Sequence, residues 1–181
     1  MLMHPRHSLL LLIDIQERLV PAIHEHERVV ENSAWLLNLA RELGIPVLVS
    51  EQYPRGLGAT VPEIRAGLAE SERFEKVHFS CVADQGCREA IAESGRDQVV
   101  VAGIEAHVCV TQSVLQLLES GRQVFVVADA VASRSPRDAE AGLQRMRQAG
   151  AQIVTREMVF FEWLQRAGTD EFKRLSKQYV R

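Results

Sequence analysis

The sequence predicts an α/β fold, a three-layer α/β/α sandwich around a six-stranded parallel sheet of Rossmann-like type. Six short apolar runs alternate with segments of helical periodicity along the 181 residues. The runs are spaced far enough apart for the crossover connections that parallel strands need. With 46% apolar and 25% charged residues, the composition is that of an ordinary globular protein, so a single domain over residues 1–181 is expected.

The expected strands are short apolar runs bounded by turn residues or by a charge. The first is a continuous apolar run that follows Ser8 and ends at Asp14, the pattern of a strand buried on both faces of a sheet. The fourth is rich in valine, which favours strands. Strands are expected at residues 8–13, 46–50, 74–79, 98–102, 123–128 and 152–155.

The expected helices combine apolar periodicity with start and stop signals. The longest precedes Gly44, a residue type that commonly ends helices. Thr60, with Glu63 three positions on, has the spacing of a capping box and predicts a short helix, whereas residues 51–58 are rich in proline and glycine and predict a loop. Together with the one before Gly44, the longer helices are expected at residues 27–43, 84–94, 109–120, 136–150, 157–167 and 170–179.

Charge, hydropathy and cysteine usage limit the classes of partner. The 24 acidic and 21 basic side chains are scattered and give a net charge of -3, so nucleic acid is not an expected partner. No apolar run approaches the roughly 18 residues of a membrane span, so no membrane partner is expected. Three cysteines without a pairing pattern predict free thiols and a cytoplasmic location.

Three chemically active side chains lie near the carboxyl ends of the expected strands, where ligands of such folds bind. Asp14 directly follows the first strand, Lys76 lies on the third, and Cys109 follows the fourth after a turn. Each residue also has an ordinary interpretation. The aspartate is a common turn residue, the lysine can extend its ammonium to water, and a buried cysteine is usually inert.

Cys109 is the strongest candidate for a nucleophile. A thiol in the first turn of a helix faces the positive end of the helix dipole and unpaired N–H groups, which favour a thiolate and can later bind an oxyanion. A nucleophile also needs a base, and a nearby cation stabilises the anionic forms. Asp14, Lys76 and Cys109 supply one group of each kind, so we predict that they form a catalytic triad.

The chain resembles the isochorismatase-like family of cysteine hydrolases over nearly its whole length. The resemblance rests on the segment 14–16 (Asp-Ile-Gln), on Lys76 and on the segment 103–110 (Gly-Ile-Glu-Ala-His-Val-Cys-Val). It implies the isochorismatase-like hydrolase fold and a catalytic triad of the matching aspartate, lysine and cysteine. It further implies a cis peptide bond between Ile104 and Glu105, with the amides of Glu105 and Cys109 as oxyanion donors.

One segment departs from the metal-dependent branch of that family. Nicotinamidase-like members carry an Asp-x-His metal motif after the second strand, whereas this chain has Glu-Gln-Tyr-Pro at residues 51–54. Tyr53 does not replace a histidine as a neutral nitrogen ligand. We therefore predict no metal and no cofactor, and the segment resembles isochorismatase-domain proteins whose substrates are poorly characterised.

The expected activity is hydrolysis of a small amide-like substrate through a covalent thioester on Cys109. Gln16, Leu19, Tyr53 and His107 are expected to line the substrate pocket, although packing at the helix turn explains His107 equally well. The alternatives are a catalytically silent binding protein and a thiol-redox protein on the same scaffold. The second is disfavoured because no resolving cysteine is evident in the sequence. A homo-oligomer is expected.

Overall fold

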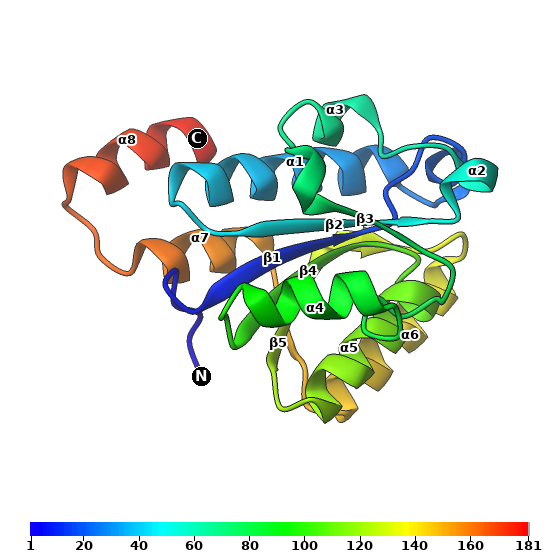
Figure 1. Ribbon diagram of the computed structural model, residues 1–181. Helices are drawn as coiled ribbons and strands as arrows, with labels where there is room; N and C mark the ends of the chain where they lie inside the picture. Colours follow the sequence, from blue (N-terminus) through cyan, green and yellow to red (C-terminus); the bar gives the residue numbers. More distant parts are fainter. Residues whose placement is uncertain (181) are drawn as a thin grey trace.

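The fold is built on a six-stranded parallel sheet with the strand order β3-β2-β1-β4-β5-β6 (Figure 1). The computed structural model describes residues 1–180. The chain starts in the middle of the sheet, extends to one edge through β2 and β3, and then returns to the centre with β4. The strands are β1 (Ser8–Ile13), β2 (Val47–Gln52), β3 (Arg73–Lys76), β4 (Gln98–Ile104), β5 (Gln123–Ala132) and β6 (Gln152–Val154).

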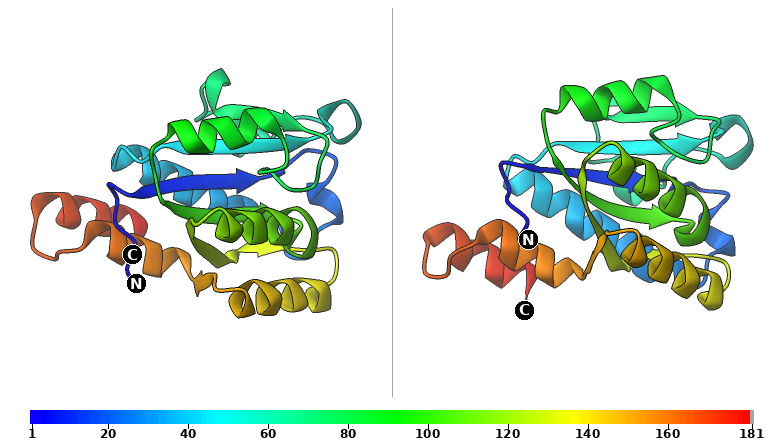
Figure 2. Two further views of the ribbon diagram at one scale, coloured as in Figure 1. Left: turned by 60° about the horizontal axis from the view of Figure 1, so that its bottom comes forward. Right: turned by 90° about the horizontal axis from the view of Figure 1, so that it is seen from below.

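Helices cover both faces of the sheet, as the predicted three-layer sandwich requires (Figures 1 and 2). The helices α1, α7 and α8 lie on one face, and α4, α5 and α6 lie on the other. No helix within residues 1–180 combines the length and the apolar character needed to cross a bilayer. The helices are α1 (His26–Glu42), α2 (Pro54–Leu57), α3 (Pro62–Arg65), α4 (Gln85–Glu93), α5 (Thr111–Glu119), α6 (Pro136–Gln148), α7 (Arg156–Leu164) and α8 (Asp170–Tyr179).

The sheet separates two apolar cores, because successive residues of a strand point to opposite faces. On β1, Leu10 and Leu12 belong to the core under α1 and α7, whereas Leu9, Leu11 and Ile13 belong to the core under α4, α5 and α6. All six residues of β1 are buried, which explains why this strand is a continuous apolar run rather than an alternating one.

Gly103 allows β4 to pass very close to β1 just before the strand ends. Its φ is +119°, and a Cβ at this position would lie 2.1 Å from the carbonyl oxygen of Ile13. The pairing of β4 with β5 also shifts register between Val101 and Gly103. Only glycine fits this approach, and it brings the end of β4 next to the residue that follows Ile13, which is Asp14.

Three local expectations differ from the structure. Residues 51–58 are not all loop, because β2 continues to Gln52 and a short helix, α2, follows it. Thr60 does not cap a helix: α3 starts after Val61 without a side-chain cap, and the hydroxyl of Thr60 donates to Glu51 instead. The third strand ends at Lys76, which leaves residues 77–84 outside any helix or strand.

The helix expected from Cys109 also begins differently. Ala106–Val110 forms a π-helical turn, η3, and α5 begins only at Thr111. The N–H of Val110 donates to the carbonyl of Glu105, a bond that spans five residues. Gly142 of α6 packs so closely against Ala106 that a Cβ would lie 3.0 Å from its carbonyl oxygen. Cys109 is therefore in a widened turn, a feature often found at functional sites.

Candidate active site

Asp14 lies where β1 leaves the sheet, and its side chain is completely buried. Its φ is 55°, so the residue adopts the left-handed conformation, which aspartate tolerates better than most residues. One carboxylate oxygen accepts a hydrogen bond of 2.7 Å from the hydroxyl of Ser50 at the end of β2. The other accepts one of 2.7 Å from the ammonium group of Lys76. The carboxylate is thus held between the ends of two neighbouring segments of the sheet.

Lys76 is the last residue of β3, and its side chain is also inaccessible to solvent. Besides Asp14, its Nζ donates to the side-chain oxygen of Gln52 at 2.6 Å and to the backbone carbonyls of Phe79 at 3.0 Å and His78 at 3.3 Å. An ammonium group surrounded by acceptors stays charged even when it is buried. The ordinary interpretation of Lys76, an ammonium extended to water, is therefore wrong.

The two buried charges stabilise one another. Burial is the largest single effect and lowers the pKa of Lys76, but the charge and hydrogen bond of Asp14 together with the charges of Cys81 and Cys109 outweigh it, so the pKa is raised above its usual value. Burial raises the pKa of Asp14, against the opposing effects of Lys76, Ser50 and Cys109. A carboxylate whose pKa is raised is a better proton acceptor, so this aspartate is suited to act as a base.

Cys109 lies in η3 beside this pair, with 5% of its surface exposed. Its thiol is near enough to the carboxylate of Asp14 for each group to shift the pKa of the other. Burial, followed by the negative charge of Asp14, raises the pKa of the thiol, and Lys76 lowers it less. The expectation of a thiolate stabilised by a helix start is therefore wrong for the resting site. Here burial and an adjacent anion keep the thiol protonated.

The peptide bond between Ile104 and Glu105 is cis, at the point where β4 enters η3. The carboxylate of Glu105 is mostly buried and accepts hydrogen bonds from the backbone N–H of Arg134 at 3.1 Å and from its Nε at 3.0 Å. Arg134 follows β5, so this contact ties the turn before Cys109 to the next strand of the sheet. The assignment of the Glu105 and Cys109 amides as oxyanion donors remains a prediction.

Gln16 does not line a pocket, contrary to expectation. It is fully buried, and its side-chain amide bonds to the backbone of β2: its oxygen accepts from the N–H of Gln52 at 2.7 Å, and its nitrogen donates to the Gln52 carbonyl at 3.0 Å. The same nitrogen donates to the carbonyl of Gly58 at 2.7 Å. All polar atoms of this side chain are engaged, so its role is to position the end of β2 and with it Gln52, a partner of Lys76.

The other three expected pocket residues lie at different places. Leu19 is half-buried and packs against the core under α1. The ring of His107 is half-buried, and its Nδ1 is 2.9 Å from the hydroxyl of Ser133, so the packing interpretation holds for this residue. Tyr53 is 55% exposed and borders a pocket.

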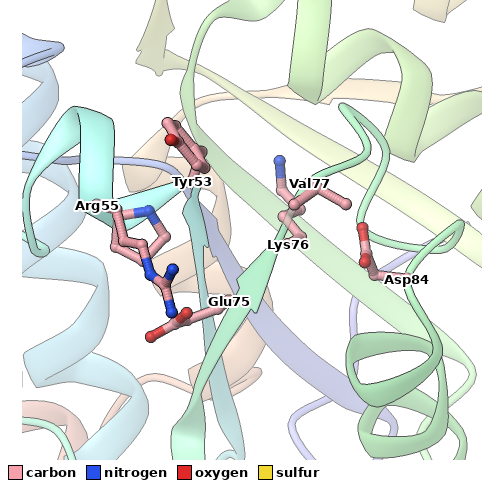
Figure 3. Close-up of a pocket in the computed structure, with 7 residues that line it drawn as sticks. Tyr53, Arg55, Glu75, Lys76, Val77 and Asp84 are labelled. Atoms are coloured by element: carbon pink, nitrogen blue, oxygen red, sulfur yellow. The ribbon is translucent and has the colours of Figure 1, made fainter.

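The pocket at Tyr53 has a volume of about 300 Å³ and lies between β2 and β3 (Figure 3). Of the predicted triad, Lys76 lines this pocket, whereas Asp14 and Cys109 do not. In Figure 3, Tyr53 and Lys76 point the same way, and Arg55, from α2, lies beside Glu75 of β3. The lining residues are Tyr53, Pro54, Arg55, Glu75, Lys76, Val77 and Asp84.

Sequence reasoning missed Ser50 and Gln52, which hold Asp14 and Lys76 in place. The sequence does contain a signal for them: the apolar start of β2 is followed by the polar residues 50–52, and the strand is buried along its whole length. Glu51, between them, is also buried and accepts bonds from the backbone and hydroxyl of Thr60 at 2.7 and 2.6 Å. Within residues 1–180, no group of three His, Cys, Asp or Glu side chains is arranged to hold a metal ion.

Comparison with known families gives a match over most of the chain. Residues 8–158 match the family described as "Isochorismatase domain". Isochorismatase domain-containing protein 2 of Danio rerio is 40% identical over 170 residues, which cover 94% of this chain and 85% of that protein. Isochorismatase domain-containing protein 2A of Mus musculus is 39% identical over 173 residues, covering 96% and 82%.

Solved structures agree with this match. A structure described as MAR1 ribonuclease from Caenorhabditis elegans superposes with a TM-score of 0.92 at 37% identity, covering 100% of this chain and 93% of the other. The Escherichia coli YcaC gene product, described as an octameric hydrolase of unknown specificity, has a TM-score of 0.92 at 25% identity, covering 99% and 91%. The sheet, its order and its helical layers are thus those of this group of structures.

Proposed function

This chain belongs to the isochorismatase domain family, and we propose that it is a hydrolase that cleaves the C–N bond of a small amide-like substrate through a thioester on Cys109. The observation that carries the proposal is the buried ion pair of Lys76 and Asp14 beside the Cys109 thiol. Burying two charges is costly unless their geometry is good. A pair that only stabilised the fold would not need a thiol against its carboxylate.

In the proposed first step, Asp14 takes the proton of Cys109 while the sulfur attacks the substrate carbonyl carbon. The resting thiol is protonated, so proton transfer accompanies attack. Lys76 stays charged throughout and compensates the negative charge on sulfur or on the carboxylate, whichever carries it. The hydroxyl of Ser50 donates to Oδ1 of Asp14 and the ammonium group of Lys76 donates to Oδ2, so the two bonds fix the orientation of the carboxylate.

In the second step, the tetrahedral intermediate collapses and the C–N bond breaks. Asp14 returns its proton to the leaving nitrogen, which leaves an acyl group on the sulfur. Asp14 is then ionised again and removes a proton from water, and the resulting hydroxide attacks the thioester carbon. The acid product leaves, and the thiol is restored. The amides of Glu105 and Cys109 are proposed to hold the oxyanion of both intermediates.

A panel of small amides and carbamoyl compounds tests the proposal. Wild-type protein should hydrolyse at least one class of compound, and Cys109→Ala should reduce the rate to the uncatalysed background. Asp14→Asn should lower it by about 10²- to 10⁴-fold, the usual contribution of a general base. Cys87→Ala is the matched control, because it removes a buried cysteine outside the triad and should keep the activity.

The panel includes an RNA substrate, because the similar C. elegans structure is described as a ribonuclease. Amide hydrolysis that is equally fast in wild type and in Cys109→Ala would refute the nucleophile assignment. Cleavage of RNA that depends on Cys109, with every amide unchanged, would refute the substrate class. Inertness toward the whole panel would favour the silent binding protein.

We also propose that the chain assembles into a homo-oligomer. The E. coli structure that it resembles is described as octameric. On α7, the side chains of Met158 and Phe161 are 45% and 46% exposed, although Val159 and Phe160, which lie between them, are buried. Large apolar side chains on a surface favour burial against a partner. Light scattering of the purified protein should give a multiple of the 20.3 kDa chain mass, and a monomer at micromolar concentration would contradict the proposal.

A further inference from the structure

All three cysteines lie in the same buried cluster, under the helices α4, α5 and α6. Cys81 belongs to residues 77–84, which follow Lys76, and Cys87 lies near the start of α4. Cys109 is the thiol of the proposed triad, and all three are reduced. No cysteine able to resolve an oxidised Cys109 is evident in the sequence, but the structure brings two further thiols to the same side of the sheet.

A single hydroxyl connects Cys81 to Cys109. The N–H of Cys81 donates to Oγ of Ser113 at 2.9 Å, and the same Oγ donates to the carbonyl of Cys109 at 2.7 Å. The thiols of Cys81 and Cys87 are near enough to shift one another's pKa, which is lowered for Cys81 and raised for Cys87. Cys81 therefore lies between the active-site cysteine and Cys87.

The three thiols differ in their access to solvent. Cys109 is 5% exposed, whereas Cys81 and Cys87 are 0% and 1% exposed. A small oxidant therefore meets Cys109 more readily than the two cysteines behind it. Transfer from Cys109 is then the direct route by which Cys81 and Cys87 would be oxidised in the folded protein.

We propose that Cys109, Cys81 and Cys87 form a thiol relay that converts oxidation of Cys109 by a hydroperoxide into a Cys81–Cys87 disulfide. The relay would return the active-site thiol to its working form before it is oxidised irreversibly. It rests on the proposed function only in taking Cys109 as the reactive thiol, and it adds a second chemistry to the same residue.

Each step of the relay balances. Asp14 takes the proton of the Cys109 thiol as the sulfur attacks one oxygen of the hydroperoxide, the O–O bond breaks, and the proton passes to the leaving oxygen, so that the products are a sulfenic acid and an alcohol or water. Cys81 attacks that sulfenic sulfur, releases water and forms a Cys81–Cys109 disulfide. Cys87 then attacks the sulfur of Cys81 by thiol–disulfide exchange, which frees Cys109 as a thiol. The two electrons given to the peroxide come finally from Cys81 and Cys87.

The surroundings of Cys81 suit the attacking role. Cys87 lowers the pKa of the Cys81 thiol. Burial and the negative charge of Asp14 oppose this, and Lys76 and Ser113 lower the pKa further, so that it lies below its usual value. A thiolate is the attacking species in disulfide chemistry. Residues 77–84 lie outside helices and strands, so no helix or strand has to be broken for Cys81 to adjust to disulfide geometry.

Peptide mapping after peroxide treatment tests the relay. Wild type, Cys81→Ala and Cys87→Ala are treated with hydrogen peroxide near stoichiometric amounts, alkylated, digested and analysed by mass spectrometry. Wild type should accumulate the Cys81–Cys87 disulfide with Cys109 still alkylated. Cys87→Ala should stop at the Cys81–Cys109 disulfide and recover with dithiothreitol. Cys81→Ala should progress to a sulfinic acid on Cys109, with several-fold faster irreversible oxidation of that residue.

The wild-type map decides the question even if a variant folds poorly. Sulfinic acid on Cys109 with Cys81 and Cys87 still reduced would overturn the relay, as would equal rates of irreversible Cys109 oxidation in wild type and Cys81→Ala. The readout is mass alone, so it is independent of substrate. A protein that forms the disulfides but hydrolyses no amide refutes the proposed function and leaves the relay standing.

Discussion

Replacing Lys76 with methionine removes the charge that compensates the buried carboxylate of Asp14, while keeping most of the side-chain volume. At the 2.7 Å separation of Nζ and Oδ2, the gross attraction is about 6 kcal/mol with an effective dielectric constant of about 20. Much of it offsets the cost of burying the two charges. Breaking such a pair from one side typically costs about 3–5 kcal/mol of unfolding free energy, because the remaining charge is stranded.

A double-mutant cycle measures this coupling. Urea unfolding of Lys76→Met, Asp14→Asn and the double variant should show that the double loses clearly less than the two single losses added together. Lys173→Met is the control, because its ion pair with Asp170 is on the surface, and it should leave stability unchanged within error. Losses that add to within about 0.5 kcal/mol would refute the view that the two charges stabilise one another.

Three further outcomes are expected. Gly103→Ala should lower the free energy of unfolding by at least about 3 kcal/mol or prevent folding, because the new Cβ would lie 2.1 Å from the carbonyl oxygen of Ile13. Gly44→Ala is the control: a Cβ there meets open space, so only the positive φ is strained and the loss should be about 1 kcal/mol. Urea unfolding measures both losses. Burial opposes ionisation of Glu72, but hydrogen bonds from Arg41 and from the N–H of Ala69, with the charge of Arg41, together outweigh it and lower the pKa, so Glu72 stabilises the fold above about pH 4.5 and less as the pH falls. Glu72→Gln should therefore flatten the acid limb of the stability curve by less than about 1 kcal/mol, and an unchanged limb would contradict this. Asp14→Asn should retain the fold by circular dichroism while losing turnover.

The strands and their parallel arrangement were predictable, because a buried strand needs a continuous apolar run and turn residues mark its ends. The run from Ser8 to Ile13 gives β1 with the expected bounds. The start of α8 follows an equally local rule, because the hydroxyl of Thr169, just before the helix, accepts a hydrogen bond from the N–H of Phe172.

The contacts that assemble the site depend on strand order, which a local pattern does not contain. Gln16 is an example: beside Asp14 in the sequence, it was expected in the pocket, yet it bonds to the backbone of β2 because β1 and β2 are neighbours in the sheet. The same contact positions Gln52, which no motif singled out. The protonation state of Cys109 was missed because it depends on burial and on an anion from another strand, not on the turn that holds it.

The most direct test of the site is the pH at which Cys109 is alkylated, compared between wild type and Asp14→Asn. In the wild type, burial and the charge of Asp14 raise the pKa of the thiol, and Lys76 lowers it. Removing the negative charge leaves Lys76 facing the sulfur, so the midpoint should move to lower pH in the variant, by at least about one unit. An unchanged midpoint, or one at higher pH, would show that Asp14 and Cys109 do not share one electrostatic site.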